Sequence, residues 1–166
     1  MDGSGVPAVS ALHHVALPVA DVDASVAWYE RVLGGVVERR TDVGPEAAEG
    51  RVAQAWLRVG EVTLNLAQGP PVQRTEAQHF FHYALVGEPG TLGAWIEHLG
   101  ALGVAVLGPY GHGGLSFVSL YVDDPDGYRW EVVVDHPSHA HARAAASAHG
   151  GALGNPMRTY EWEETG

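Results

Sequence analysis

The pattern of apolar and polar positions predicts short strands and helices in a repeated order. Residues 12–19 fit a strand, and an apolar stripe with helical spacing follows at Val22, Val26, Tyr29 and Leu33. The stripe predicts a helix over residues 23–33, with Asp21 or Asp23 as its N-terminal cap. Three further strands are predicted over residues 36–41, 52–59 and 62–67.

The same order returns about 68 residues later in the chain. HVAL at 14–17 is matched by HYAL at 82–85, and AWYE at 27–30 is matched by AWIE at 94–97. The second copy predicts a strand over 80–86, a helix over 91–102 with Leu92, Trp95, Ile96 and Leu99 inward, and strands over 104–107, 115–122 and 128–134. The sequence therefore predicts an α+β fold made of two βαβββ modules.

The length of 166 residues fits one domain that holds both modules. We expect module 1 over about 11–68, module 2 over about 79–135 and a C-terminal extension over 136–166, in which an alternating segment at 157–162 folds over a module face. An apolar fraction of 46% and a charged fraction of 17% exclude an intrinsically disordered chain.

Charge and composition narrow the function classes. The chain carries 20 acidic and 9 basic residues, and this net charge of -11 argues against nucleic acid or an anionic membrane as a partner. No apolar run approaches the roughly 20 residues of a membrane span, and no signal segment opens the chain, so we expect a cytoplasmic protein. The chain has no cysteine, so any metal must bind histidine and carboxylate.

Two histidines and one carboxylate form the candidate metal site. His14 and His82 occupy equivalent places in the repeat, and Glu131 lies on the last predicted strand of module 2. One such histidine alone is more often a hydrogen-bonded core residue. Duplication together with Glu131 favours metal ligation, and strand alternation predicts that His13 points away from His14.

Three motifs carry a resemblance to a known family. LHHVALPVADVDASVAWYERVLG at 12–34, HYAL at 82–85 and SLYVDDPDGYRWEV at 119–132 resemble the vicinal oxygen chelate superfamily. That superfamily includes glyoxalase I, fosfomycin-resistance enzymes, bleomycin-binding proteins, methylmalonyl-CoA epimerase and type I extradiol dioxygenases. The resemblance implies two modules that form a pair of half-barrels, with His14, His82 and Glu131 as the metal ligands.

Module 1 departs from the four-ligand members of that family. Counted from the turn glycines, the residue that corresponds to Glu131 is Leu64, with Asn65 beside it, so no carboxylate stands there. Three protein ligands leave about three open positions on an octahedral metal, which suits non-haem Fe(II) that binds substrate and O2 together. Mn(II) accepts the same ligands, and the sequence does not choose between the two metals.

The resemblance also implies an extradiol dioxygenase that acts on a catechol. His112, Tyr121 and Glu131 stand 9 and 10 residues apart, as in catechol-cleaving members. The resemblance makes His112 the acid/base group and Tyr121 a hydrogen-bond partner of the substrate oxygen, although His112 also fits a surface loop histidine. Arg129 is a candidate clamp for a substrate carboxylate, with structural pairing to an aspartate as the alternative.

The short length resembles 3,4-dihydroxyphenylalanine (L-DOPA) 2,3-dioxygenases, so the expected partners are a small aromatic diol and O2. A fosfomycin-type epoxide transferase or hydrolase, or a glyoxalase-like enzyme, is the first alternative, and the absence of lysine weakens the fosfomycin reading. A metal-free bleomycin-type drug-binding protein is the second. A homodimer is compatible with the sequence, and the oligomeric state stays open.

Overall fold

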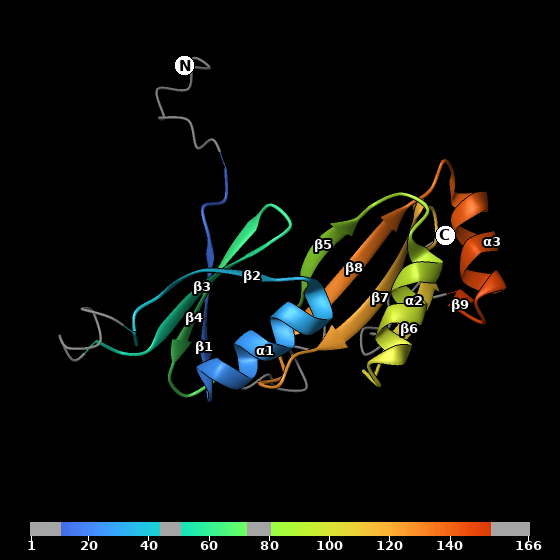
Figure 1. Cartoon of the computed structure of the whole chain (residues 1–166). Coiled ribbons are helices and arrows are strands. Elements are labelled where there is room, and N and C mark those ends of the chain that lie inside the picture. Colours follow the sequence, from blue (N-terminus) through green and yellow to red (C-terminus); the bar gives the residue numbers. More distant parts are fainter. Residues whose placement is uncertain (1–10, 44–50, 73–80, 154–166) are drawn as a thin grey trace, which may run out of the picture. The chain divides into compact units, whose positions relative to one another are not determined.

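The computed structural model describes residues 11–43, 51–72 and 81–153. The chain divides into two compact units, Met1–Pro71 and Val72–Gly166. Each unit holds one βαβββ module, as Figure 1 shows, so the α+β class and the two repeated modules are confirmed. The starting residue of the strand predicted from Phe80, and the alternating segment at 157–162, lie outside the described residues.

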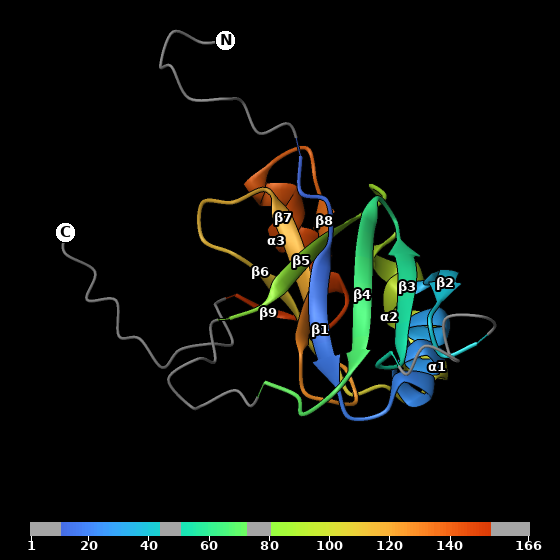
Figure 2. The same ribbon diagram turned by 90° about the vertical axis from the view of Figure 1, so that its left-hand side faces the viewer.

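Unit 1 is a four-stranded sheet with one helix. Its elements are β1 (Val15–Val19), α1 (Val22–Leu33), β2 (Val36–Arg40), β3 (Gln54–Val59) and β4 (Val62–Gln68). The strand order is β1-β4-β3-β2, with β1 parallel to β4 and the other pairs antiparallel (Figure 2). Helix α1 packs on β3 and β4.

Local sequence explains why α1 begins and ends where it does. The Asp21 carboxylate accepts a hydrogen bond from the backbone N–H of Ala24 at 3.0 Å, so Asp21 is the cap. Gly34 ends the helix with φ of 67°, a left-handed conformation that favours glycine. The predicted stripe is buried, and Tyr29 and Val32 on this helix have no exposed surface.

Unit 2 is a five-stranded sheet with two helices. Its elements are β5 (Tyr83–Gly87), α2 (Leu92–Ala101), β6 (Leu107–Gly111), β7 (Phe117–Asp123), β8 (Arg129–Asp135), α3 (His139–Ala148) and β9 (Ala152–Leu153). The strand order is β5-β8-β7-β6-β9, with β5 parallel to β8 and β9 parallel to β6. The core under the helices includes Val118, Leu120, Val132 and Val134.

Two predictions in module 2 need correction. The strand predicted over 104–107 is wrong, because the observed strand β6 begins at Leu107 and runs through Gly-Pro-Tyr-Gly. Glycine and proline are depleted in strands, so the sequence pattern did not predict a strand there. The predicted inward face of α2 is buried less completely than expected. Leu92 and Leu99 are buried, while Trp95 and Ile96 are half-buried, although the Trp95 indole does lie against Gly87 of β5.

The C-terminal extension adds a helix and an edge strand to unit 2. Ala142 and Ala146 of α3 are buried, and α3 packs on β6 and β7, beside α2 (Figure 1). A Cβ added at Gly151 would lie 2.1 Å from the backbone oxygen of Pro109 and 2.8 Å from that of Ala146. Only glycine therefore allows the chain to pass from α3 into β9.

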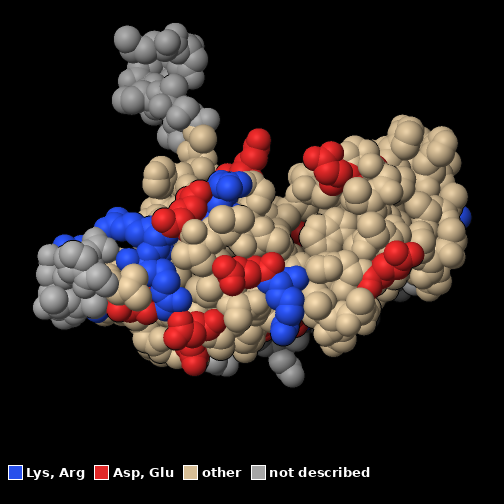
Figure 3. All heavy atoms as spheres, viewed as in Figure 1, with Lys and Arg blue, Asp and Glu red and all other residues tan. Residues whose placement is uncertain are grey.

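Charged side chains are paired over unit 1. Arg40 lies 2.7 Å from Asp23 and 2.5 Å from Asp42, and Arg58 lies 3.0 Å from Glu38. Figure 3 shows acidic and basic side chains side by side on this unit. None of the helices in the described residues is long and apolar enough to cross a membrane.

We expect Gly151→Ala to lower the free energy of unfolding by about 1–3 kcal/mol, because the added methyl overlaps two backbone oxygens that cannot rotate away. Gly100→Ala is the control, since nothing lies within 4 Å of a Cβ there and alanine favours a helix by about 0.5–1 kcal/mol. Urea unfolding of both variants checks the prediction, and equal stability of the two would contradict it.

Candidate active site

The candidate site of unit 2 lies on one face of the β5-β8-β7 strands. Glu131 on β8 is opposite Ala84 on β5 and Tyr121 on β7, and Ser119 lies two residues along β7 on the same face. Glu131, Tyr121 and Ser119 are 5%, 2% and 0% exposed. The other face of β7 packs apolar side chains toward the helices, so both faces of this strand are covered.

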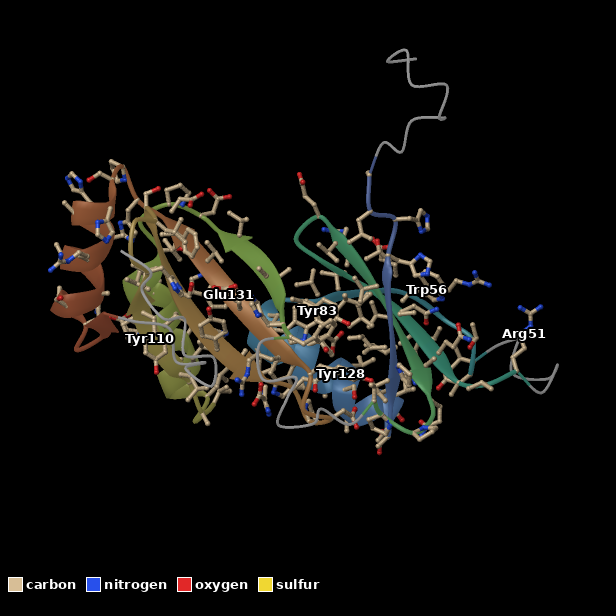
Figure 4. The ribbon with its side chains drawn as sticks, turned by 180° about the vertical axis from the view of Figure 1, so that it is seen from behind. Arg51, Trp56, Tyr83, Tyr110, Tyr128 and Glu131 are labelled. Atoms are coloured by element: carbon tan, nitrogen blue, oxygen red, sulfur yellow. The ribbon has the colours of Figure 1, made fainter. Side chains whose placement is uncertain are left out.

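The Glu131 carboxylate is the acceptor at the centre of this face (Figure 4). Its Oε1 accepts hydrogen bonds from the Ser119 hydroxyl at 2.5 Å and from the Tyr121 hydroxyl at 2.8 Å. Its Oε2 lies 2.8 Å from Nε2 of His82. Burial raises the pKa of Glu131, but the bonds from His82, Ser119 and Tyr121 outweigh burial and hold the pKa below its ordinary value.

Two of the predicted site residues, His82 and Tyr121, are in contact in the structure. His82 lies just before β5, and its ring meets the Tyr121 ring edge-on with centroids 5.6 Å apart. Burial, followed by the hydrogen bond to Glu131, raises the pKa of Tyr121 well above its usual range. Tyr121 therefore stays protonated and donates a hydrogen bond to Glu131. Its oxygen still has lone pairs that can accept a further hydrogen bond.

His112 joins the same network through Ser119. It follows β6 directly, and its Nε2 lies 2.8 Å from the Ser119 hydroxyl oxygen. The ring also lies against Phe117, with centroids 5.1 Å apart. Burial lowers the pKa of His112, which favours the neutral imidazole at neutral pH. His112 is thus half-buried in the site and does not stand free in a surface loop.

The Arg129 guanidinium forms an ion pair with Asp123. Its Nε and Nη2 bond the two carboxylate oxygens at 2.8 and 2.9 Å, a bidentate pair across β7 and β8. The alternative of pairing with an aspartate is therefore what the structure shows. A role of Arg129 in substrate binding stays a prediction.

His14 belongs to unit 1 and is exposed there. Its ring packs on Trp56, with centroids 5.1 Å apart, and its Nδ1 lies 2.8 Å from Nδ1 of His13. The prediction that His13 points away from His14 is wrong, because both residues precede β1 and strand alternation does not apply to them. Within the described residues, no three His, Asp or Glu side chains gather closely enough to hold a metal.

The counterpart of Glu131 in unit 1 is Asn65, and the match to Leu64 is wrong. Asn65 is opposite Ala16 on β1 and Trp56 on β3, just as Glu131 is opposite Ala84 and Tyr121. Counting from the turn glycines failed because the two β-turns differ in length. Two residues separate the paired positions Val59 and Val62, whereas five separate Asp123 and Arg129.

On the face of unit 1 that corresponds to the site face of unit 2, the side-chain oxygen of Asn65 lacks a hydrogen-bond donor within the described residues. Its Nδ2 donates to Gln54 Oε1 at 3.4 Å, while its Oδ1 is buried and accepts no hydrogen bond within the described part of the chain. Figure 4 labels Trp56, its neighbour on β3. A buried amide oxygen without a donor is costly unless a ligand or water completes it.

Sequence reasoning missed Ser119 and Asn65. Ser119 interrupts the apolar run of β7, and this break in an otherwise apolar strand is the one signal that pointed to it. Asn65 became recognisable only from the strand register.

Comparison with known proteins identifies the family. The model of the glyoxalase/bleomycin resistance protein/dioxygenase superfamily matches residues 11–132. The chain belongs to this superfamily. Helix α3 and strand β9 of this chain therefore lie beyond the part that the superfamily model matches.

Relatives and solved structures agree with this membership. The chain is 29% identical over 128 residues to a lactoylglutathione lyase of Neisseria meningitidis, which covers 74% of this chain and 88% of that protein. The fosfomycin resistance protein FosX of Listeria monocytogenes has the same fold at 16% identity, with a TM-score of 0.65 over 78% of this chain and 94% of that one. A superfamily domain from a Frankia species gives a TM-score of 0.61 at 21% identity, over 82% and 99% of the two chains.

We expect Tyr121→Phe to lower the free energy of unfolding of the metal-free protein by about 1.5–3 kcal/mol, the usual worth of a hydrogen bond to a charged group. Tyr110→Phe is the matched control, because that ring lies 6.4 Å from Tyr121 and its hydroxyl has no hydrogen bond within the described residues. Urea unfolding in the presence of a chelator measures both. A loss no larger than that of the control would show that Glu131 does not need this donor.

Proposed function

We propose that this protein is an extradiol ring-cleaving dioxygenase that acts on a small catechol with non-haem Fe(II) and O2. The observation that carries the proposal is the buried network on Glu131. One carboxylate contacts His82 and Tyr121 directly and contacts His112 through Ser119. Under this proposal the network would supply two metal ligands, a tyrosine that hydrogen-bonds the substrate and a neutral imidazole.

The donor atoms of unit 2 suit a divalent metal. His82 Nε2 and Glu131 Oε2 face one another at 2.8 Å, and imidazole nitrogen with carboxylate oxygen is a donor set that Fe(II) and Mn(II) accept. We propose His14 of unit 1 as the third ligand. When bound, the metal would act as a Lewis acid for the catechol oxygens and provide the position for O2.

The chain's own residues then orient the substrate and move its proton. Tyr121 stays protonated and donates to Glu131, so its oxygen would accept the hydrogen bond of a catechol hydroxyl. His112 stays neutral and would take the proton of the second hydroxyl as a general base. The resemblance to short dioxygenases makes 3,4-dihydroxyphenylalanine the first substrate to test.

We expect the protein reconstituted anaerobically with Fe(II) to consume O2 with 3,4-dihydroxyphenylalanine or another catechol, and to form a yellow ring-opened product. Loss of a residue that only hydrogen-bonds a metal ligand lowers activity by roughly 10- to 100-fold. His82→Ala removes a proposed ligand itself, so it should lower the rate by more than that. His98→Ala on α2 is the control, since His98 is exposed. An oxygen electrode and visible absorbance measure the rates. Iron binding without O2 uptake on any catechol would reject the dioxygenase.

A lyase of the glyoxalase type is the second candidate, and Asn65 favours it. The buried Oδ1 of Asn65 lies at the place that matches Glu131, where a four-ligand metal site would need an oxygen. The 29% identity to a lactoylglutathione lyase points the same way. Formation of lactoylglutathione by the metal-loaded protein would support this candidate.

Asn65 separates the two candidates by metal affinity. Under the dioxygenase proposal the metal has three protein ligands, so Asn65→Leu should leave the Kd of Fe(II) within about twofold. Asn65→Asp is the control that retains an oxygen at this place. Calorimetric titration of the metal-free proteins measures the Kd. A weakening of tenfold or more in Asn65→Leu, which corresponds to about 1.4 kcal/mol, would favour the lyase.

A further inference from the structure

Ser119 is a buried polar residue on a strand that is otherwise apolar. It is 0% exposed, as are its neighbours Val118 and Leu120, which face the helix side of the sheet. An alanine would satisfy the packing of this position. A buried hydroxyl costs free energy unless both its proton and its lone pairs are used, so this serine needs a reason beyond packing.

The protons of the network can be assigned one by one. An ionised carboxylate only accepts, so the single proton of the Ser119 hydroxyl goes to Glu131 Oε1, 2.5 Å away. The Ser119 oxygen is then left as an acceptor. The contact of 2.8 Å with His112 must therefore be a bond that Nε2–H of His112 donates.

The opposite arrangement fits the site less well. If His112 accepted at Nε2, the proton of Ser119 would point to the imidazole and Glu131 would lose one of its donors. The doubly protonated imidazolium is disfavoured, because burial lowers the pKa of His112. The Phe117 ring also lies beside the imidazole, with centroids 5.1 Å apart.

We propose that Ser119 is a positioning residue that holds His112 as the Nε2–H tautomer and leaves Nδ1 as the free base. The Ser119 hydroxyl donates its proton to the Glu131 carboxylate, so its oxygen can only accept a hydrogen bond from His112. These hydrogen bonds run from β8 through β7 to the end of β6. The catalytic consequence rests on the proposed function, since only then does Nδ1 take a substrate proton. The tautomer itself does not depend on any activity.

The first test is nuclear magnetic resonance of the metal-free full-length protein labelled with 15N. Long-range 1H–15N correlations show which ring nitrogen carries the proton, and His112→Gln assigns the signals. We expect wild type to show one tautomer, with a Nε2–H proton protected from exchange with water. Ser119→Ala should lose that protected proton, and Ser119→Thr should restore it. An unchanged protected signal in Ser119→Ala would overturn the proposal.

The second test is the rate of the Fe(II)-loaded protein. Ser119→Ala should lower kcat by about 10- to 100-fold, part of what a general base contributes, while KM changes by less than about threefold. Ser119→Thr should recover most of the rate. Ser25→Ala, which removes a buried hydroxyl in α1 of unit 1, is the control and should leave kcat unchanged.

The two tests separate the failure of this inference from that of the proposed function. If wild type turns over no catechol, the dioxygenase fails while the resonance result still decides the role of Ser119. If Ser119→Ala raises KM or loses iron with kcat unchanged, Ser119 only supports Glu131 and the inference is overturned.

Discussion

The structure of unit 2 depends on one constraint, the burial of the Glu131 charge. A carboxylate that is 5% exposed is tolerated only when donors surround it, and Ser119, Tyr121 and His82 provide them. Ser119 and Tyr121 come from β7 and His82 from the residue just before β5, and strand pairing on both sides of β8 brings the three donors to Glu131. The register of β5, β8 and β7 is therefore fixed by chemistry as well as by apolar packing, since a slip of one residue would turn Glu131 into the helix-covered core.

The two units share a register but carry different chemistry at equivalent places. Where unit 2 has Glu131 opposite Tyr121, unit 1 has Asn65 opposite Trp56. A neutral amide needs fewer donors than a carboxylate, so unit 1 requires no buried cation or hydroxyl cluster on that face. The two modules thus share a backbone arrangement, while the buried carboxylate at this position is found in unit 2.

The C-terminal extension completes the second sheet beyond the part shared with the superfamily model. Strand β9 pairs with β6, which would otherwise be an edge strand, and α3 covers the helix side of β6 with buried alanines. Small residues are needed here because Gly111 and Gly151 bring backbone close to α3. Covering an edge in this way protects the sheet from pairing with other chains. It also stabilises β6, which ends at Gly111, directly before His112, and so helps to hold this histidine at the site.

The sequence alone determined the repeat and the α+β class, because spacing along a strand or helix decides which face a residue occupies, but it left the helix cap open between Asp21 and Asp23. The repeat predicted His82 and Glu131, and the family resemblance predicted Tyr121. It also singled out His112. The tertiary structure decided what spacing does not encode. Pairing between strands showed that Asn65, and not Leu64, corresponds to Glu131, since turn length shifts any count made along the chain. Likewise, Ser119 became part of the site only because the fold places its hydroxyl between an imidazole and a carboxylate from two other segments.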